Sequence, residues 1–569
     1  MIIQFVFNMS EWKYKWWQKT TVYQIYPRSF KDSTGNGIGD LQGILSKLDY
    51  LEELGVETIW FSPFFNSPQQ DHGYDVRDFR CIAPEYGMLS DFDQLLKEMH
   101  DRKMKMVLDF VLNHTSIDHP WFIESASSRD NPKRNWYIWR DGRKSDGKKP
   151  PNNWTTMTGG CAWLYYENTD QWVYFHFLPS MIDLNYRNPE VKEEMFNTMR
   201  FWLNKGVDGF RLDILHAIYE DEQLTNDKFS WTIIPSDKKV DTLFHKHKYD
   251  LNLPETFNFA LELREVMDEY EPERFLVGEV SGSIEEIKKY YGPNNNGLHM
   301  CFLFEFASTP FNPKKYASLI SRVEKALLFP LTPTFVYGNH DRDRYISLLK
   351  NNFHEAKILT TMQLTLRGVP FIYYGEEIGM PNVRFKLKTS EDPIGRKFSW
   401  FPIPQLSRLI GFSLTRDRCR TPMQWNNDKN AGFSSNIEIE PWLKVSDTFK
   451  KINVEKEQKN PASLLNCYKR LLRVRKENIA LQEGKLQLIE HKKSERNYIS
   501  YTRSHKAQKI FIYLNFTKKE LLIQTPIEKP GLLFSTLSNR KALDTKAYNG
   551  NIKLTPLEGI IFKKIKNKK

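Results

Sequence analysis

The chain has 569 residues, of which 40% are hydrophobic and 14% aromatic, and its net charge at pH 7 is +12. This length is too great for one ordinary domain and suits a large α/β barrel with accessory domains. Lys and Arg are spread through the chain, and the one dense basic cluster is the tail from Phe562 to Lys569. A solvated tail is therefore favoured over a nucleic-acid-binding arm, and we expect no nucleic-acid partner.

Cysteine usage and hydropathy bear on the compartment. The five cysteines are an odd number without metal-type spacing, which argues against a disulfide framework. The stretch from Met1 to Phe7 has no basic lead and too short an apolar run for a secretory signal. No segment has the roughly 18 consecutive apolar residues of a membrane span. We therefore expect a soluble, cytoplasmic protein with no membrane partner.

The first predicted strand, 21–26, is followed by a polar loop at 32–40 in which oxygen-bearing side chains alternate with glycines. This alternation is typical of a calcium-binding loop. The candidate ligands are the side chains of Asp32, Thr34, Asn36 and Asp40 and the carbonyl of Ile38. Because only two of the four side chains are carboxylates, a metal-free turn is an equal alternative. Structural calcium is the expected cofactor, and no organic cofactor is expected.

Helices and strands then alternate along most of the chain. Helices are predicted at 42–54, 90–102, 189–204 and 463–476. The predicted strands lie near residues 22, 57, 105, 207, 274, 298, 334 and 369. Eight parallel strands separated by helices form a (β/α)8 TIM barrel, whose active site lies at the carboxyl ends of the strands.

Two stretches break this alternation. The passage 115–181 is rich in Trp, Asn, Gly and Pro and is far longer than an ordinary loop after a strand. Beyond 485, short strands at 485–490, 498–502, 510–514 and 559–562 are separated by polar turns, which indicates an antiparallel β domain. The predicted domains are a catalytic barrel (1–114 and 182–484), an inserted subdomain B after the third strand (115–181) and a C-terminal β domain (485–569).

The predicted strand 206–213 ends in an acid. Arg211 lies two residues before Asp213, so both side chains leave the strand on the same side. We expect the guanidinium to keep Asp213 ionised near neutral pH, as a carboxylate nucleophile requires. A purely structural Asp–Arg pair is the alternative.

Four acids fall at the carboxyl ends of different predicted strands: Asp109, Asp213, Glu279 and Asp341. They are therefore expected to converge on one mouth of the barrel. Two carboxylates on either side of one bond are the apparatus of glycoside cleavage. Glu279 follows apolar residues and has no Arg two positions away, so we expect its surroundings to raise its pKa, as a general acid requires.

Five ordered motifs resemble those of glycoside hydrolase family 13, the α-amylase family. They are YQIYPRSF at 23–30, DFVLNH at 109–114, GFRLD at 209–213, GEV at 278–280 and GNHD at 338–341. The closer resemblance is to the oligo-1,6-glucosidase and maltase branch, which IDLN at 182–185 and RTPMQW at 420–425 also resemble. The resemblance covers nearly the whole chain.

The resemblance implies a role for each acid. Asp213 is the implied nucleophile, Glu279 the acid/base, and Asp341 the third acid, which grips sugar hydroxyls and distorts the ring. Arg211 is implied to orient Asp213. The loop at 32–40 resembles the calcium loop of this branch, although Thr34 and Asn36 stand where more acidic or amide groups are common.

The resemblance also implies a pocket for one terminal glucose. Asp71 binds a hydroxyl, Tyr74 stacks beneath the ring, and His114 and His340 donate hydrogen bonds in the first subsite. Arg420 is implied to close the pocket, and two nearby arginines, at 416 and 418, are alternatives. The implied substrate-binding residues are Asp71, Tyr74, His114, Arg211, His340 and Arg420.

The implied function is that of a retaining, exo-acting α-glucosidase, which hydrolyses terminal α-1,6- or α-1,4-linked glucose from short oligosaccharides through a covalent glucosyl-enzyme. A small oligosaccharide is the expected partner, and the chain is expected to be a monomer or a simple homo-oligomer. A sugar-rearranging relative, such as a trehalose synthase or sucrose isomerase, has the same acids and is the main alternative. A non-catalytic transporter heavy chain is a second alternative, but the intact acids argue against it.

Linkage preference depends on the residue after the nucleophile. In the resembling branch, a branched apolar residue there goes with isomaltose-type substrates, and Ile214 is of that kind. The pair Met181 and Ile182 before Asp183 departs from the Gln-Pro usual in the oligo-1,6 group. We therefore expect acceptance of α-1,6 links without an absolute preference.

Overall fold

The computed structural model describes residues 13–143, 147–232, 241, 244–399, 414–490, 497–506, 508–541 and 548–564. The amino-terminal stretch and most of the basic tail, on which two of the predictions above rest, lie outside these residues. Within them, no helix is long and apolar enough to cross a membrane. The cellular compartment stays a prediction.

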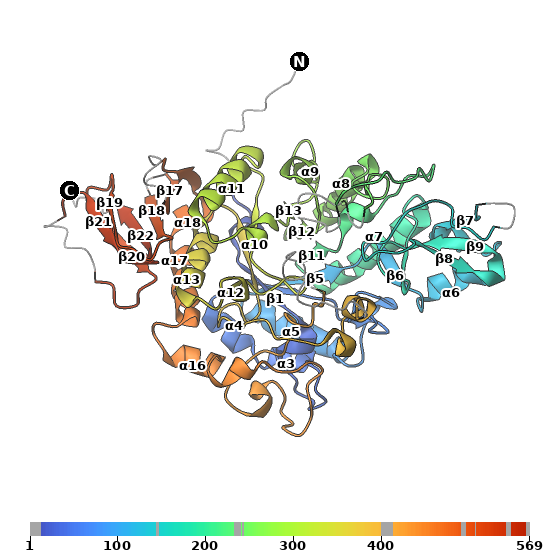
Figure 1. Ribbon diagram of the computed structural model, residues 1–569, viewed down its shortest axis with the longest axis horizontal. Helices are drawn as coiled ribbons and strands as arrows, with labels where there is room; N and C mark the ends of the chain where they lie inside the picture. The colour runs from blue at the N-terminus through green and yellow to red at the C-terminus, as the bar shows by residue number, and fades with distance from the viewer. Residues whose placement is uncertain are drawn as a thin grey trace, which may run out of the picture.

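A parallel sheet of eight strands is the centre of the molecule (Figure 1). In chain order, its strands are β1 (Val22–Ile25), β2 (Thr58–Phe61), β5 (Lys105–Phe110), β11 (Gly209–Leu212), β12 (Phe275–Gly278), β13 (Met300–Cys301), β14 (Thr334–Val336) and β15 (Val369–Tyr373). Their order in the sheet is β13-β12-β11-β5-β2-β1-β15-β14. The eight predicted strands are all present, and they form a nearly closed TIM-like barrel.

The two edge strands of this sheet, β13 and β14, face each other across a seam. The hydroxyl of Thr334 donates to the carbonyl of Cys301 at 2.9 Å, and it accepts from the backbone N–H of Leu303 at 3.1 Å. One side chain therefore bridges the seam where no ladder hydrogen bonds join the strands.

Helices cover the outside of the barrel. The main ones are α5 (Leu89–Asp101), α7 (Pro189–Lys205), α8 (Pro254–Asp268), α11 (Pro313–Ala326), α13 (Phe353–Thr365) and α17 (Leu464–Glu477). The helix predicted at 42–54 is instead two helices, α3 (Leu41–Leu45) and α4 (Leu48–Leu54). The hydroxyl of Ser46 donates to the carbonyl of Gly43 at 2.6 Å, and such side-chain bonds compete with helix continuation.

The residues at the two ends of α7 determine where this helix begins and ends, directly before β11. Asn188 caps the amino terminus of the helix by accepting from the N–H of Glu190, and Pro189 occupies the first turn. Gly206 ends the helix at φ 106°, in the left-handed region that favours glycine. All four residues of β11 are buried, because the strand lies between β5 and β12 in the barrel wall.

The passage after β5 contains small antiparallel sheets. Strand β6 (His114–Ser116) pairs with β10 (Met181–Asp183), and β7 (Trp139–Arg140), β9 (Gln171–Tyr174) and β8 (Trp163–Tyr166) form a second sheet in that order. In Figure 1 this subdomain extends from one side of the barrel. The exact domain boundaries, 115–181 included, stay predictions.

The C-terminal strands form a five-stranded antiparallel sheet on the opposite side of the barrel (Figure 1). Its strands are β16 (Lys485–Leu488), β17 (Tyr498–His505), β18 (Gln508–Asn515), β22 (Gly559–Lys564) and β20 (Pro530–Ser535). The pair β19 (Leu521–Gln524) and β21 (Asn551–Leu554) forms a separate ribbon. Arg503 is fully buried and donates to the carbonyls of Thr365 and Leu366, both at 2.7 Å, which ties the sheet to the barrel.

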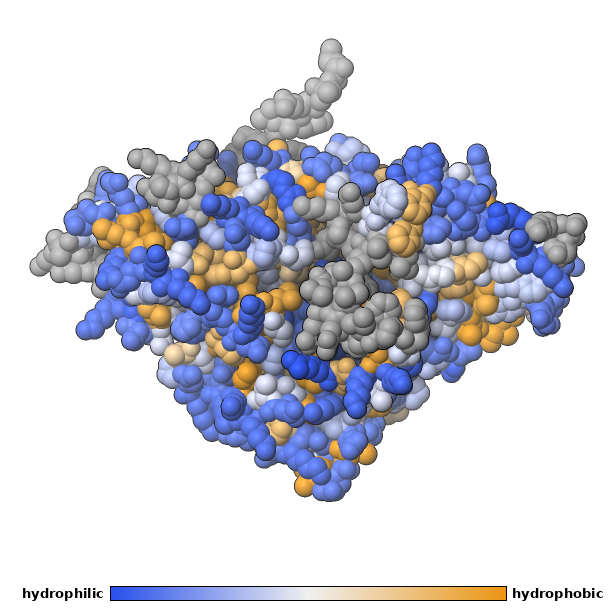
Figure 2. Space-filling model, in the orientation of Figure 1, coloured by the Kyte–Doolittle hydropathy of each residue, from blue (hydrophilic) through white to orange (hydrophobic). Residues whose placement is uncertain are grey.

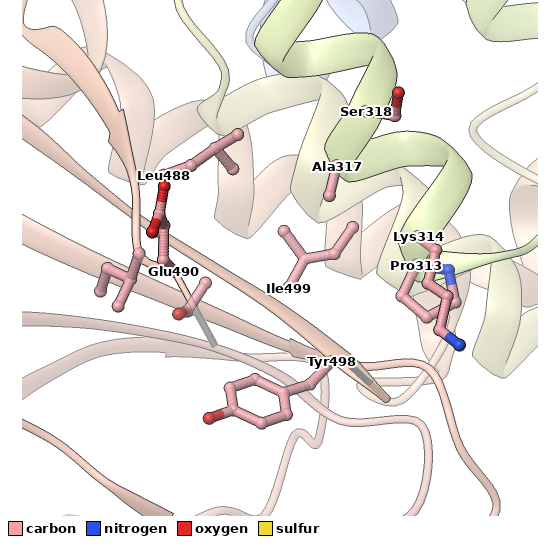
Figure 3. Close-up of a pocket in the computed structure, with 10 residues that line it drawn as sticks. Pro313, Lys314, Ala317, Ser318, Leu488, Glu490, Tyr498 and Ile499 are labelled. Atoms are coloured by element: carbon pink, nitrogen blue, oxygen red, sulfur yellow. The ribbon is translucent and has the colours of Figure 1, made fainter. Parts of the chain in front are cut away.

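A cavity of about 400 Å³ lies where α11 meets the C-terminal sheet (Figure 3). Lys314 and Ala317 of α11 face Leu488 and Ile499 of the strands across this space. None of the residues that line it is a predicted site residue. The molecular face in Figure 2 is largely hydrophilic, with apolar residues in scattered patches.

Candidate active site at the carboxyl ends of the barrel strands

Three of the predicted acids lie at the same height along neighbouring barrel strands. Residue Arg211 of β11 lies beside Asp109 of β5 in the sheet register. The ladder continues past the strand ends, because the N–H of Asp213 donates to Phe110 at 3.1 Å and that of Glu279 donates to Leu212 at 2.9 Å. The backbone therefore fixes the positions of all three acids.

Arg211 is the centre of this cluster and is fully buried. Its Nη1 donates to Asp109 Oδ1 at 2.7 Å and to Asp213 Oδ1 at 2.6 Å, and its Nη2 donates to Glu279 Oε2. The predicted pairing of Arg211 with Asp213 is confirmed. Glu279 has no Arg two positions away in the sequence, but Arg211 reaches it from the adjacent strand.

Burial dominates the electrostatics of the cluster. Burial raises the pKa of Asp213 well above its ordinary value, although Arg211 opposes the shift, and it raises the pKa of Asp109 to about 6. The expectation that Arg211 keeps the pKa of Asp213 low is therefore wrong, because burial has the larger effect. Three carboxylates share a single guanidinium, so their mutual repulsion favours retention of a proton within the group.

Asp341, the third predicted acid, accepts hydrogen bonds from two arginines and lies beside a histidine. Its Oδ1 accepts from Arg420 at 2.9 Å and from Arg416 at 3.3 Å, and its Oδ2 lies 3.0 Å from Nε2 of His340. Burial opposes ionisation, but these three neighbours outweigh it and hold the pKa of Asp341 well below its usual range. These neighbours therefore favour the ionised form of Asp341.

Tyr74 connects the two groups of acids. Its hydroxyl donates to Asp109 Oδ2 at 3.1 Å and lies 2.5 Å from His340 Nε2, and its ring stacks on that of His340 at 5.3 Å. The amide of Gln24 donates to His340 Nδ1 at 2.8 Å, which leaves the imidazole proton on Nε2. Burial lowers the pKa of His340, so the ring is neutral and its Nε2–H can donate.

His114 is also held neutral, because burial lowers its pKa to about 4. Its Nδ1 lies 3.0 Å from Asn113 Oδ1 and its Nε2 lies 3.2 Å from the carbonyl of Tyr74. Both neighbours are acceptors, and a neutral ring has only one N–H to offer. The donation to sugar predicted for His114 and His340 stays a prediction.

The contacts of Asp71 show which of the three candidate arginines lies beside it. Arg416 donates to Asp71 Oδ1 at 2.5 Å and is held by Asp392, whose Oδ1 lies 2.8 Å away. Arg420, the predicted closing residue, instead donates to Asp341, while Arg418 pairs with an acid outside this group. Arg416 is therefore a better candidate than Arg420 for the arginine that closes the predicted glucose pocket.

Asp71 and Asp392, which both contact Arg416, have pKa values shifted in opposite directions. Burial raises the pKa of Asp71 to about 6, although Arg416 opposes the shift. Burial also disfavours the charge of Asp392, but its bidentate contact with Arg416 outweighs this effect and lowers its pKa to about 2. Asp392 lies in no motif that predicts a binding role. Its one signal is the Asp-Pro pair, which caps the helix α14 (Pro393–Lys397).

Ile214, directly after the predicted nucleophile, has a left-handed backbone with φ 36° and ψ 42°. This region is unfavourable for a β-branched residue, and such outliers persist where the surrounding structure imposes them. The following residue, Leu215, donates its N–H to the carbonyl of Glu279 at 3.1 Å. The turn therefore joins the ends of β11 and β12 and leaves Ile214 half-buried at the mouth.

The predicted calcium loop at 32–40 is filled with its own hydrogen bonds. Asp32 accepts four and Asp40 accepts four, and Asn36 Oδ1 accepts from the N–H of Ile38 at 2.8 Å. Three of these eight donors to the two acids are hydroxyl groups, Thr34 among them, and hydroxyls rotate readily. The other five donors are backbone N–H groups, so a calcium ion would have to share these carboxylates with the loop's own hydrogen bonds, and calcium binding stays a prediction.

Comparison with known proteins gives consistent matches over nearly the whole chain. The family model described as alpha amylase, catalytic domain, matches residues 24–484. The oligo-1,6-glucosidase of Bacillus cereus is 36% identical over 577 residues, which cover 96% of this chain and 99% of that protein. An alpha-glucosidase of Candida albicans is 40% identical over 510 residues, 82% of this chain and 86% of that protein.

Solved structures agree with these matches. The alpha-glucosyl transfer enzyme XgtA has a TM-score of 0.86 at 32% identity and covers 97% of this chain and 100% of its own. The trehalulose synthase MutB from Pseudomonas mesoacidophila MX-45 has a TM-score of 0.85 at 31% identity, with the same coverage. Taken with the barrel and the acids at its mouth, these matches show that the chain belongs to glycoside hydrolase family 13, the α-amylase family.

Proposed function

We propose that this enzyme is a retaining, exo-acting α-glucosidase that removes terminal α-linked glucose from short oligosaccharides. The observation that carries the proposal is the convergence of Asp109, Asp213 and Glu279 on Arg211 at the carboxyl end of the barrel. Relatives named oligo-1,6-glucosidase and alpha-glucosidase support the substrate class.

Asp213 is the proposed nucleophile, and it attacks the anomeric carbon of the terminal glucose while Glu279 protonates the departing oxygen. Arg211 contacts both carboxylates and orients them. Glu279 then takes a proton from water, which attacks the glucosyl-enzyme and releases glucose with its α configuration.

The proposed glucose pocket explains exo action. Asp71 and Arg416 form an ion pair at one end of the pocket, and Asp341 beside Arg420 presents a fixed anion to sugar hydroxyls. Charge-assisted hydrogen bonds from this buried pair to the hydroxyls of one terminal sugar are proposed to restrict binding to chain ends. Tyr74 supplies the ring on which that sugar stacks.

A second candidate is a sugar-rearranging or glucosyl-transferring activity. XgtA and MutB, at 32% and 31% identity, bear names of that kind. Transfer and hydrolysis share the glucosyl-enzyme and differ in how well water is excluded when it breaks down. The two functions therefore differ in their products rather than in the acids.

A panel of maltose, isomaltose, sucrose and trehalose separates the two functions. We expect free glucose as the main early product from at least one of them, released first as the α-anomer. Chromatography measures the products, and proton NMR of the first turnovers measures the anomer. Isomeric disaccharides in place of glucose would favour the rearranging function, and early β-glucose would exclude a retaining mechanism.

Linkage preference is proposed to depend on Ile214. The side chain is bulky and has no hydroxyl, so it can pack against the extra methylene of an α-1,6 link. One such contact contributes about 1 to 3 kcal/mol, and the expected preference is therefore tens-fold rather than absolute. For Ile214→Thr, the ratio of kcat/KM for isomaltose to that for maltose should fall by about tenfold.

The kinetic test compares wild type, Ile214→Thr and Ile214→Val with both disaccharides. Valine keeps the branched apolar surface and serves as the matched control, so its ratio should stay close to that of the wild type. A wild type that ignores isomaltose, or a Thr variant whose ratio does not move toward maltose, contradicts the proposal.

Calcium at the loop 32–40 is proposed to stabilise the fold without taking part in the chemistry. A bound ion stabilises the folded state by an amount that grows with the logarithm of its concentration relative to its Kd, so a chelator should lower the Tm by a few degrees. Activity at room temperature should change less. Calorimetry with chelator and then with excess calcium is the measurement, and a Tm that neither treatment moves would show that the loop's own hydrogen bonds suffice.

A further inference from the structure

A second cluster of ionisable side chains lies apart from the catalytic acids. Asp227, His247 and Asp250 each offer one ligand atom, and these atoms all lie within 4.8 Å of one another. Their side chains come from the long loop between η3 (Leu215–Ala217) and α8 (Pro254–Asp268). The three residues are only 7%, 3% and 1% exposed.

Several polar atoms of this cluster have no hydrogen-bond partner. They are both carboxylate oxygens of Asp227, Oδ1 of Asp250 and Nε2 of His247. An unsatisfied polar atom in a buried position costs about 1 to 3 kcal/mol, and more where it carries charge. Two buried carboxylates also repel each other. One divalent cation would contact a ligand atom of each of the three residues at once, which no single additional hydrogen bond can do.

The surrounding contacts hold the cluster in place. His247 Nδ1 lies 2.7 Å from Asp250 Oδ2, an arrangement that fixes the imidazole ring. The backbone of Asp227 is bonded at both its N–H and its carbonyl to the side chain of Asn153, at 2.8 and 3.0 Å. Trp154 Nε1 adds a hydrogen bond of 2.8 Å to the carbonyl of Thr225. The loop is therefore attached to the inserted subdomain next to the cluster.

We propose that Asp227, His247 and Asp250 bind one divalent transition-metal ion, for which zinc is the best match. Imidazole and carboxylate together suit zinc, whereas calcium and magnesium prefer ligand sets made of oxygen alone. A zinc ion with three protein ligands accepts a fourth. His176, whose Nε2 is also buried without a partner and whose Nδ1 lies 3.8 Å from Asp250, is near enough to orient or complete the site.

The role of this ion is structural. It joins the loop that follows the nucleophile strand to the inserted subdomain, because His176 lies between β9 and β10. The neighbouring Phe177 ring lies 6.1 Å from the ring of His114, a predicted substrate-binding residue. Phe177 therefore links His176 to a predicted substrate-binding residue. It is distinct from the predicted calcium loop at 32–40, which lies after β1.

The direct test is zinc binding by the full-length enzyme. Protein freed of metal with a chelator and then desalted is titrated with zinc chloride by calorimetry, and the retained metal is measured by mass spectrometry after gel filtration. We expect one zinc per chain and a rise in Tm that calcium or magnesium does not reproduce. A wild-type protein that retains no zinc, or that binds calcium equally well, overturns the proposal.

Ligand variants locate the ion. Asp227→Asn and His247→Gln should each weaken zinc binding by at least about tenfold, since even partners of ligands have effects of that size. His245→Gln is the matched control, because His245 lies on the same loop and outside the group. Unchanged zinc affinity in both ligand variants, with far-UV circular dichroism like that of the wild type, overturns the assignment. An equal loss in His245→Gln does so as well.

Discussion

Asp213→Asn should lower kcat/KM by about four to six orders of magnitude, because a nucleophile that is part of a cooperating unit cannot be replaced by its neighbours. Asn has nearly the same shape and can still accept from Arg211, which donates to Asp213 at 2.6 Å in the native site. The fold should therefore persist, and the Tm should change little or rise, since one buried carboxylate is removed from a group of three that share one guanidinium. Steady-state kinetics on maltose and isomaltose, with calorimetry on the same samples, measure both effects.

Asp208→Asn is the matched control at the opposite end of β11. Asp208 is buried and pairs with Lys105 at 2.9 Å and with Arg274 at 3.4 Å. Loss of its charge leaves these cations without their partner, so this variant should have a lower Tm and a kcat close to that of the wild type. Activity of Asp213→Asn within about tenfold of wild type would exclude Asp213 as the nucleophile.

Glu279→Gln should lower kcat on maltose and isomaltose by about two to four orders of magnitude, because a poor leaving group needs a proton as its bond breaks. A glucoside with a good leaving group, such as a nitrophenolate, needs no such proton. With that substrate the first step should survive, and the glucosyl-enzyme should accumulate because no base activates water. Rapid-mixing kinetics with the aryl glucoside should then show a burst followed by a slow steady state.

The exposed Glu285, at the start of α9 (Ile284–Lys289), provides the control for this substitution. Glu285→Gln should have wild-type kinetics on both kinds of substrate. Equal losses by Glu279→Gln on the aryl glucoside and on the natural disaccharides, without a burst, would show that Glu279 does not act as the acid.

Much of the barrel could be predicted from the sequence because its strands are short apolar runs bounded by helices and glycines. The predicted strand near 207 is β11, and the predicted helix at 463–476 is α17, shifted by one residue. The break between α3 and α4 was missed, because Ser46 lies in a helical pattern and its hydrogen bond to the Gly43 carbonyl cannot be read from that pattern.

The strands of the C-terminal domain could be predicted only in part. Four of its short strands follow the alternation expected from sequence, and all four are present. The strands β19, β20 and β21 were not predicted. Of these, β20 begins at Pro530, whose lack of an N–H weakens any strand signal, and its pairing with β22 contains a register shift between Leu532 and Phe534.

The candidate site could be predicted where strand geometry determines it. Residues at period two lie on one side of a strand, which places Arg211 against Asp213. The contact between Arg211 and Glu279 crosses from one strand to the next, and local spacing carries no information about it. For the same reason the sequence could not separate Arg416 from Arg420, since both lie on a loop without periodicity and only their contacts with Asp71 and Asp341 distinguish them.

The pKa of Asp213 could not be predicted, because it depends on the whole cluster. One neighbouring guanidinium favours the ionised carboxylate, but burial and two further acids oppose it. The group of Asp227, His247 and Asp250 was likewise missed, because its members are brought together by a loop rather than by a spaced motif.

The most direct test of the account is to trap the glucosyl-enzyme. A fluorinated α-glucosyl fluoride slows breakdown of the covalent intermediate, so the label remains on the residue that attacked the anomeric carbon. Peptic digestion and tandem mass spectrometry then identify that residue. The account predicts one glucosyl label per chain, on Asp213, whereas a label on Glu279 or Asp341, or turnover without any covalent label, would contradict it.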